Sequence, residues 1–303
     1  MQDWRPGASN RLLQLRAELN RAIREFFYQR QVLEVETPVL CQAPVIDPNI
    51  EPIQAQGRYL HTSPEYAMKR LLCADSGDIF QIAKVFRCGE AGQRHNPEFS
   101  MLEWYRVDWD HWQLMDEVAE LLRLIFKQSF PRLDLSYTDA LRQFAQIKWT
   151  DCDDGAVRAR GIELAGADLE LDRDGWLDII MSHQVEPNLP RDTLVFIYDY
   201  PPSQAALSKV RVDESSAHAE RFEVFLNGVE LANGYHELTD HQEQKKRFFD
   251  ESKGRDIDQR LLQAMASGMP ECAGVAMGLD RILMLLTGLE FIDEVVSFSW
   301  DRA

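Results

Sequence analysis

The sequence lacks long apolar runs and paired cysteines. The first ten residues, MQDWRPGASN, hold none of the apolar core of a secretory signal. No apolar run elsewhere approaches the roughly 20 residues that a membrane-spanning helix needs. The five cysteines are scattered and none has CxxC spacing, so neither a disulfide framework nor a zinc site is indicated. These absences predict a cytoplasmic protein with reduced, mostly structural cysteines and no membrane partner.

Basic blocks are also missing. Acidic residues outnumber Lys and Arg by 50 to 33, which gives a formal net charge of −17. Proteins that bind nucleic acid over a large surface usually carry a basic patch. The charge therefore disfavours a large RNA-binding surface. It favours a basic protein partner or a small cationic substrate.

The composition is otherwise that of an ordinary globular protein, with 303 residues, 45% of them hydrophobic and 27% charged. A chain of this length can bury a large core. Residues from about 131 to 191 are Asp-rich and less periodic than the rest. We expect one domain over residues 1–303 with an inserted, less regular segment at 131–191.

Two elements are expected at the start of the chain. Ser9 or Asn10 can cap a helix whose apolar positions recur at helical spacing as far as Phe26. The run QVLEVETPVL at 31–40 is rich in β-branched residues and contains Pro38, which favours the end of a strand or an edge strand.

Further along, a second helix is expected from Ser63, with Pro64 at its first position. The run DIFQIAKVFR at 78–87 reads as a buried strand that ends in Arg87. Asp110 precedes a third helical pattern.

The stretch RHNPEFSMLEWYR at 94–106 follows the strand at 78–87 through a short loop. If its second half is the next, antiparallel strand, alternation places Phe99, Glu103 and Tyr105 on one face. A flat ring, an acid and a phenol then lie in a row. Taken alone, an amphipathic strand whose acid meets water is the simpler interpretation.

A hairpin is indicated by RFEVFLNGVELANGYHEL, where Asn-Gly at 227–228 separates two alternating runs. A two-residue type I′ turn sets Phe225 opposite Glu230 and Glu223 opposite Ala232. The two glutamates are then diagonal neighbours on one face, about 7 Å apart. Such a pair suits Mg²⁺ that also holds phosphates. The alternative is two solvated acids on an exposed face.

The run AGVAMGLDRILMLLTG predicts a helix that opens after Gly278 and closes at Gly288. Arg281 sits in its first turn, where the helix dipole disfavours a cation. A bound phosphate at the helix N-terminus would resolve this conflict. The alternative to a phosphate-binding arginine is one that is merely solvated.

Taken together, these stretches resemble the signature motifs of class II aminoacyl-tRNA synthetases, in the same order. The first helix with the stretch ending in Pro38 resembles motif 1, FR followed by RHNPEF resembles motif 2, and GLDR resembles motif 3. TSPEYAMKRL, RHNPEFSMLEWY and GVELANGYHELTD are similar to the catalytic domain of lysyl-tRNA synthetases. The nearest resemblance is to the elongation factor P lysine lysyltransferases, a short lysyl-tRNA-synthetase-like family.

The resemblance implies an α+β fold, in which an antiparallel sheet is flanked by helices, and a homodimer that forms through motif 1. Lysyl-tRNA synthetases place an anticodon-binding OB domain before the catalytic core. Here the helix resembling motif 1 begins near residue 10, so we expect no such domain.

It also implies a site for ATP and one for lysine. Arg87 would bind the α-phosphate and the substrate carboxylate, and Phe99 would stack on adenine. Glu237 and Tyr105 are expected at the distal amine of the substrate. The ATP and Mg²⁺ positions are Arg87, Glu90, His95, Asn96, Phe99, Glu223, Glu230 and Arg281, the two glutamates 223 and 230 holding the metal. The substrate positions are Ser63, Glu65, Glu103, Tyr105, Asn233, Glu237 and Ala276.

Two positions depart from lysyl-tRNA synthetases. Their motif 2 usually reads F-R-x-E, whereas here the acid comes one residue late, as Glu90. They also carry Gly where this chain has Ala276, a change that in the lysyltransferase family accompanies a preference for (R)-β-lysine over α-lysine. One methyl in a pocket shifts selectivity by about 1 to 3 kcal/mol. A harmless strand alanine is the alternative.

The implied reaction has two steps, with Arg87 and Arg281 as catalytic residues. The substrate carboxylate attacks the α-phosphorus of ATP, and a lysine of elongation factor P then attacks the acyl adenylate. A compact enzyme that charges tRNA is a rival, disfavoured by the acidic charge. A catalytically inactive regulatory paralogue is a second rival, although Arg87, Glu223, Glu230 and Arg281 are all present.

Overall fold

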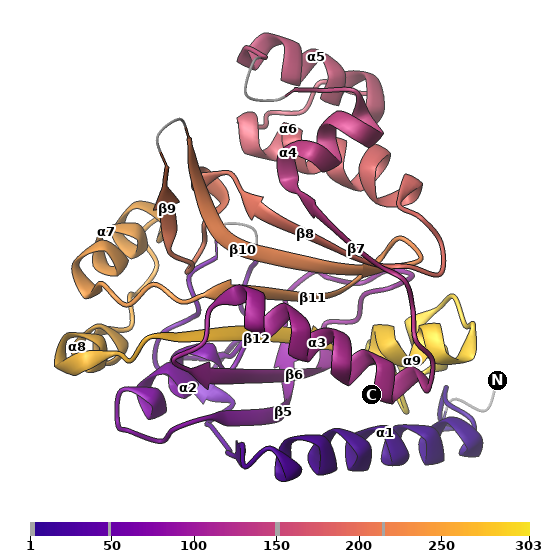
Figure 1. The fold of residues 1–303 in the computed structure, drawn as a ribbon. Helices are drawn as coiled ribbons and strands as arrows, with labels where there is room; N and C mark the ends of the chain where they lie inside the picture. Colours follow the sequence, from indigo (N-terminus) through magenta and orange to yellow (C-terminus); the bar gives the residue numbers. More distant parts are fainter. Residues whose placement is uncertain (1–3, 48–49, 149–151, 214–215) are drawn as a thin grey trace. The chain divides into compact units, whose positions relative to one another are not determined.

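The computed structural model describes residues 4–47, 50–148, 152–213 and 216–303. The chain divides into two compact units. Unit 1 combines Met1–Gln128 with Glu237–Ala303, and unit 2 is Ser129–His236. Figure 1 labels the helices and strands of both units.

Unit 1 is built on a largely antiparallel sheet. Strand β6 (Glu98–Val107) pairs antiparallel with β5 (Ile79–Phe86) and with β12 (Cys272–Gly278), and the short β1 (Leu33–Glu34) runs parallel to β5. A second small sheet joins β2 (Leu40–Cys41), β4 (Arg58–Leu60) and β3 (Gln54–Ala55). The helices of unit 1 are α1 (Asn10–Gln29), α2 (Glu65–Leu72), α3 (His111–Phe126), α7 (His241–Glu251), α8 (Gln259–Gly268) and α9 (Leu279–Thr287), with 3₁₀ turns at Ile292–Glu294 and Trp300–Arg302.

Helices α1 and α3 pack on one face of this sheet (Figure 1). The ring of Phe27 in α1 stacks on Phe80 of β5, with centroids 4.6 Å apart, and lies 5.3 Å from Trp104 of β6. The indole Nε1 of Trp104 donates to Glu117 of α3 at 3.0 Å. Because side chains alternate along β6, Glu103 and Tyr105 point to the opposite face. The expected helix caps are present, with Ser9 accepting from Leu12 and a reciprocal capping box at Asp110.

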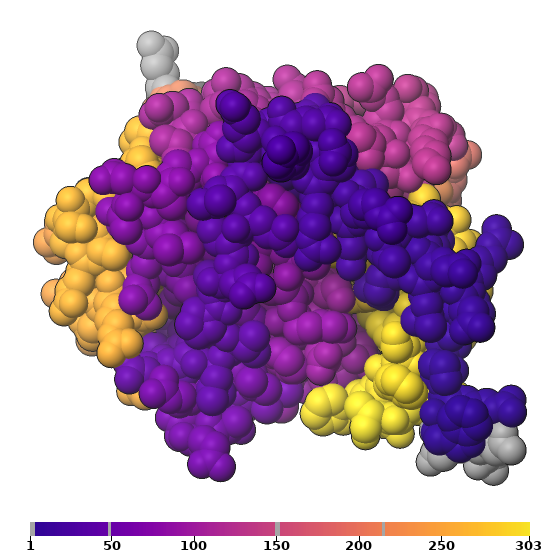
Figure 2. Space-filling model, turned by 90° about the horizontal axis from the view of Figure 1, so that it is seen from below, coloured from indigo at the N-terminus to yellow at the C-terminus, as the bar shows by residue number. Residues whose placement is uncertain are grey.

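The two ends of the chain meet in unit 1. The backbone N–H groups of Gly7 and Ala8 donate to the carbonyls of Ser297 and Val296, at 2.9 and 3.1 Å. Figure 2 shows the indigo N-terminal residues beside the yellow C-terminal ones, with α1 on the surface. Among the described residues, no helix is both long enough and apolar enough to cross a membrane.

Unit 2 is also built on paired strands. Strand β10 (Ala217–Leu226) pairs antiparallel with β11 (Val229–His236), β8 (Leu194–Tyr200) and β9 (Val210–Val212), and β7 (Arg132–Ser136) runs parallel to β8. The helices pack around Trp176 in a core that they share with buried residues of β8 and β10, among them Val195 and Phe225. The helices are α4 (Tyr137–Ala140), α5 (Asp154–Ala165) and α6 (Arg173–Ile180), with π-helical turns at Leu141–Ala145 and Met181–Val185 and 3₁₀ turns at Glu186–Asn188 and Pro202–Gln204.

The Asp-rich segment 131–191 therefore lies inside a larger compact unit that also contains the Asn-Gly hairpin. Within that segment, residues 149–151 lie outside the described part of the chain. Much of the rest is helical, because its aspartates serve as caps. The carboxylate of Asp153 accepts from the N–H of Ala156, and that of Asp172 accepts from Gly175.

Two predicted elements differ in their bounds. The run 31–40 supplies two short edge strands, β1 before Pro38 and β2 after it, in different sheets. Proline has no N–H to donate to a ladder, which is compatible with such edges. Helix α2 begins at Glu65 with Pro64 as its N-cap, while the hydroxyl of Ser63 accepts from the N–H of Glu65 at 3.0 Å.

The hairpin turn is as predicted, but its register is only partly so. Asn227 and Gly228 have φ of 56° and 73°, as a type I′ turn requires. Phe225 pairs with Glu230, but a bulge follows, so that Glu223 pairs with Asn233 and not with Ala232. An extra residue on one strand shifts every later pair by one. A turn rule that assumes a regular ladder cannot anticipate that shift.

Candidate active site

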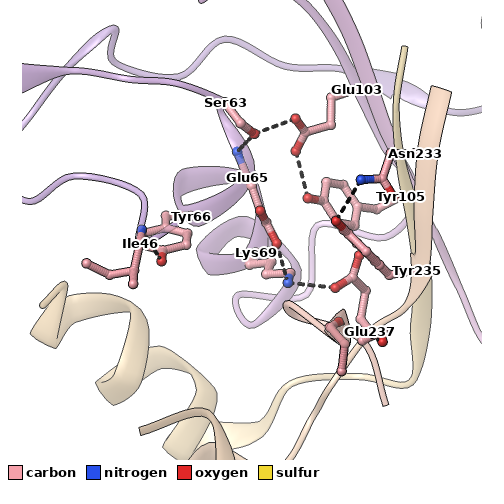
Figure 3. A network of polar contacts seen from close by, with 12 residues as sticks. Ile46, Ser63, Glu65, Tyr66, Lys69, Glu103, Tyr105, Asn233, Tyr235 and Glu237 are labelled. Carbon is pink, nitrogen blue, oxygen red and sulfur yellow. Dashed lines mark hydrogen bonds and ion pairs between the residues drawn. The ribbon is translucent and has the colours of Figure 1, made fainter. Parts of the chain in front are cut away.

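A buried polar network lies in unit 1, on the face of β6 opposite α1 and α3 (Figure 3). Glu103 is 2% exposed and accepts two hydrogen bonds, from the hydroxyl of Ser63 at 2.6 Å and from the phenol of Tyr105 at 2.7 Å. Strand β6 supplies the acid and the phenol, and the turn before α2 supplies the serine. The acid predicted on this face is therefore held in the protein and does not meet water.

Lys69 forms the second half of the network. Its ammonium lies 2.6 Å from a carboxylate oxygen of Glu65, one helical turn earlier in α2, and 2.6 Å from a carboxylate oxygen of Glu237. The exposed fractions of Lys69 and Glu237 are both 1%. Burial by itself lowers the pKa of Lys69, but Glu237 and Glu65 together outweigh it, so the pKa is raised and the lysine stays charged.

The electrostatics of Glu103 differ from those of its neighbours. Burial is the largest cause that raises its pKa, the negative charge of Glu65 adds to it, and the hydrogen bonds from Ser63 and Tyr105 oppose it. The pKa is raised to about 8. Without a nearby ligand cation, Glu103 therefore carries a proton at neutral pH.

Strand β12 borders the network through its register with β6. Ala276 lies opposite Glu103, and Gly274 lies opposite Tyr105. A Cβ at position 274 would lie 2.3 Å from the Tyr105 ring and 2.5 Å from a carboxylate oxygen of Glu237. Glycine is thus required there for the ring and the acid to occupy their positions. Ala276 places its methyl group on the same face, two residues further along.

The loop between β5 and β6 carries a second group of predicted residues. Arg87 follows β5 directly, and its guanidinium carbon lies 5.0 Å from the centre of the Phe99 ring. Its Nη1 lies 3.7 Å from Glu90. Gly89, at φ 75°, turns the chain between these two residues. This left-handed turn explains how the displaced acid of the motif can still reach Arg87.

Two further predicted phosphate-binding positions approach each other. A guanidinium nitrogen of Arg281, at the start of α9, lies 2.8 Å from Nε2 of His95. Asn96 is 5% exposed, and both ends of its amide are used by the fold. Its Nδ2 donates to the carbonyl of Glu98 at 2.6 Å, and its Oδ1 accepts from the N–H of Trp300 at 2.9 Å. Asn96 therefore connects the loop that carries His95 to the C-terminal segment.

The paired glutamates lie in unit 2. A carboxylate oxygen of Glu223 lies 2.5 Å from Arg221, which also donates to Asn233 at 3.3 Å and to the carbonyl of Gln204 at 2.8 Å. Burial raises the pKa of Glu223, Arg221 lowers it, and the charge of Glu230 raises it again. Glu223 is thus affected by the negative charge of Glu230, while its own carboxylate is paired with Arg221.

The structure groups most of the predicted residues into four sets. Ser63, Glu65, Glu103, Tyr105 and Glu237 meet in unit 1 with Ala276 on the neighbouring strand. Arg87 meets Glu90 and Phe99, and Arg281 meets His95. Glu223, Glu230 and Asn233 meet in unit 2. The predicted sites did not include Lys69, Arg221 or Gly274. Spacing could have indicated the first two, since Lys69 is four residues after Glu65 in a helix and Arg221 is two before Glu223 in a strand.

Comparison with known proteins places these motifs in a family. Residues 1–302 match the family model of class II tRNA synthetases (D, K and N). The chain is 43% identical to the elongation factor P-(R)-beta-lysine ligase of Salmonella paratyphi B, with 99% of this chain and 98% of that protein covered. Proteins of the same name from Salmonella schwarzengrund and Salmonella dublin show the same identity and coverage. With its predicted motifs and its antiparallel, helix-flanked sheets, the chain belongs to the class II tRNA synthetase family.

Proposed function

We propose that this protein activates a lysine, with (R)-β-lysine as the preferred isomer, as an acyl adenylate and transfers it to a lysine side chain of elongation factor P. The observation that carries the proposal is the buried network around Glu103. When all its groups are ionised, the network contains three carboxylates and only one ammonium, that of Lys69. Two negative charges remain, and a substrate with two ammonium groups neutralises them. The names of the relatives supply the acceptor.

Lys69 adjusts the charge of this network so that it can bind a substrate amine. Without it, three carboxylates would repel one another with no counter-charge between them. With it, Glu65 and Glu237 are held in place by an opposite charge, and Glu103 is left as the group whose charge responds to a ligand. We assign Tyr105 and Glu237 to the distal amine, and Ser63 and Asn233 to the rest of the substrate. Ala276, opposite Glu103, is assigned to the choice between lysine isomers.

In the first step the ionised substrate carboxylate attacks the α-phosphorus of ATP and expels pyrophosphate, so no general base is needed. Arg87 orients the carboxylate and the α-phosphate, and Arg281 with His95 binds the outer phosphates. Phe99 stacks on the adenine. Magnesium held by Glu223 and Glu230 would supply positive charge to the phosphates. Catalysis then rests mainly on positioning and charge stabilisation.

In the second step an amine of elongation factor P attacks the acyl carbon of the adenylate. An amide bond forms, the bond to the phosphate oxygen breaks, and AMP leaves. The attacking nitrogen loses a proton to solvent water in this step. A free amine held near the adenylate suffices as nucleophile, because the mixed anhydride is already activated.

The direct test is intact-mass analysis of elongation factor P after incubation with the protein, ATP and either (R)-β-lysine or α-lysine. We expect a gain of one lysyl unit, and a larger yield with the β isomer. Arg281→Met should abolish the gain, because it removes a cation that stabilises the phosphates. Charging of total tRNA under the same conditions, with elongation factor P left unmodified, would contradict the proposal. Pyrophosphate exchange that stayed silent with every lysine isomer would indicate an inactive paralogue.

Lysine binding should release a proton from Glu103. Its pKa is raised to about 8 in the free protein, and a bound ammonium favours the ionised form. Affinity for lysine should therefore rise with pH up to about 8 and then level off. Calorimetry at pH 7 in buffers of different ionisation enthalpy counts the released protons. Glu103→Gln should bind more weakly and release fewer protons, and an unchanged proton count in this variant would exclude Glu103 as the source.

Gly274→Ala should close the substrate site. The added methyl would force Tyr105 and Glu237 apart, since both lie within 2.5 Å of its position. We expect the KM for lysine in pyrophosphate exchange to rise by at least about tenfold, while the KM for ATP changes little. Gly92→Ala is the control, because a Cβ there meets nothing within 4 Å. Equal changes in both KM values would argue against a local effect.

We also propose a homodimer through α1, in keeping with the expected role of motif 1. Tyr28 is 77% exposed and Leu33 is 55% exposed, at the end of this helix and in the strand that follows. Sedimentation velocity should show a dimer, and Tyr28→Glu should shift it toward monomer. The control is Phe249→Glu, at an aromatic residue on α7 that is 75% exposed. A monomeric wild-type protein would refute the proposal.

A further inference from the structure

The carboxylate of Asp280 occupies a junction of unit 1 that the proposed reaction does not use. It is 2% exposed and lies in the first turn of α9, directly before Arg281. One of its oxygens accepts from the backbone N–H of Ser100 at 2.7 Å. The other oxygen is bound by the guanidinium of Arg16 in α1. Ser100 in turn directly follows Phe99.

The register of the sheet explains why an acid is needed there. The last pair between β12 and β6 is Gly278 with Met101. The chain then enters α9 at Leu279, so β12 offers no residue opposite Ser100. The side chain of Asp280 supplies the missing acceptor for the Ser100 N–H. Gly278, the N-cap of α9, has no side chain to cap the helix, so this contact also anchors the first turn.

Arg16 completes the junction. Besides Asp280, its guanidinium donates to the carbonyl of Val295 at 3.0 Å and to the hydroxyl of Ser100 at 3.4 Å. One planar group thus joins α1, β6, the first turn of α9 and the C-terminal segment. A buried carboxylate needs such a partner, because an unpaired buried charge is strongly destabilising. An ammonium in the place of the guanidinium could not form this fork of contacts.

We propose that Arg16 and Asp280 are positioning residues for the nucleotide. Their ion pair holds Phe99 and Arg281, the immediate neighbours of Ser100 and Asp280, in the relative arrangement that ATP requires. The inference rests on the proposed function, which gives these two neighbours the adenine and the phosphates. Nucleotide affinity then depends on how α1 is seated against the sheet. A shift of α1, the helix expected to contact a second subunit, would thereby move groups of the nucleotide site.

The network around Glu103 provides an internal reference. Its contacts run through Ser63, Tyr105, Glu65 and Lys69, and none of them involves Arg16 or Asp280. A loosened junction should therefore weaken nucleotide binding and spare lysine binding. Displacement of the groups that position a ligand by about 1 Å is enough to lower its productive binding many-fold. A purely structural role would instead lower both affinities in proportion to the lost stability.

The test measures binding without turnover, by calorimetry with a non-hydrolysable ATP analogue and, separately, with lysine. We expect Arg16→Met and Asp280→Asn to weaken nucleotide binding by about tenfold or more and to leave the lysine Kd within about twofold. The double variant should be no weaker than the worse single one, because both remove the same interaction. Arg16→Lys keeps the charge, should fold, and should show an intermediate loss of nucleotide affinity, so it decides the question if the other variants do not fold.

The matched control is Arg24→Met on the same helix. Arg24 pairs with Glu34 at 2.9 Å, but both side chains are solvent-exposed and neither touches Asp280. Its nucleotide affinity should equal that of the wild type. Unchanged nucleotide binding in Arg16→Lys, or equal weakening of both ligands, would overturn the inference and leave the proposed function intact. A wild-type protein that bound lysine but no nucleotide would instead refute the proposed function, and the inference with it.

Discussion

The ammonium of Lys69 lies in the interior of unit 1, between the carboxylates of Glu65 and Glu237, and the rest of the candidate site depends on that contact. A buried charge is tolerated only when it is paired, and removal of one partner costs about 3 to 5 kcal/mol. The pairing holds α2 against the segment that follows β11, and it gives two carboxylates a shared counter-charge. Glu103 is then left as the acid whose protonation responds to a ligand. The ion pairs of Lys69 thus fix the positions of the side chains, while the net charge of the network changes with the protonation of Glu103.

A second constraint is the way in which β12 ends. Along this strand, Gly274 leaves room for Tyr105 and Glu237, and Ala276 places a methyl opposite Glu103. The strand then passes directly into α9, and the ladder with β6 loses its partner at Ser100. The carboxylate of Asp280 replaces that partner. One short run of small residues thus borders the substrate network at one end and anchors Arg281 at the other.

Much of the site could be predicted because strands and tight turns have fixed periodicity. The alternation of β6 placed Glu103 and Tyr105 on one face, and the Asn-Gly pair located the hairpin. The prediction was wrong where one residue changed the count, as at the bulge after Phe225, which moved Glu223 opposite Asn233. At 31–40 the edge position was predicted correctly, but the run supplies two short strands, β1 and β2, on either side of Pro38. Bulges and broken strands depend on packing against neighbouring segments, which local patterns do not contain.

Local sequence patterns are enough to predict the order of the motifs, the helix caps, the position of the turn and the residue types of the site, since these follow from periodicity and from the chemistry of single side chains. Which charges meet depends instead on the folded chain. Lys69 and Glu237 are far apart along the chain, as are Arg16 and Asp280, and no spacing rule relates them. Their pairing arises because burial forces each charge to find an opposite one among the groups that folding brings within reach.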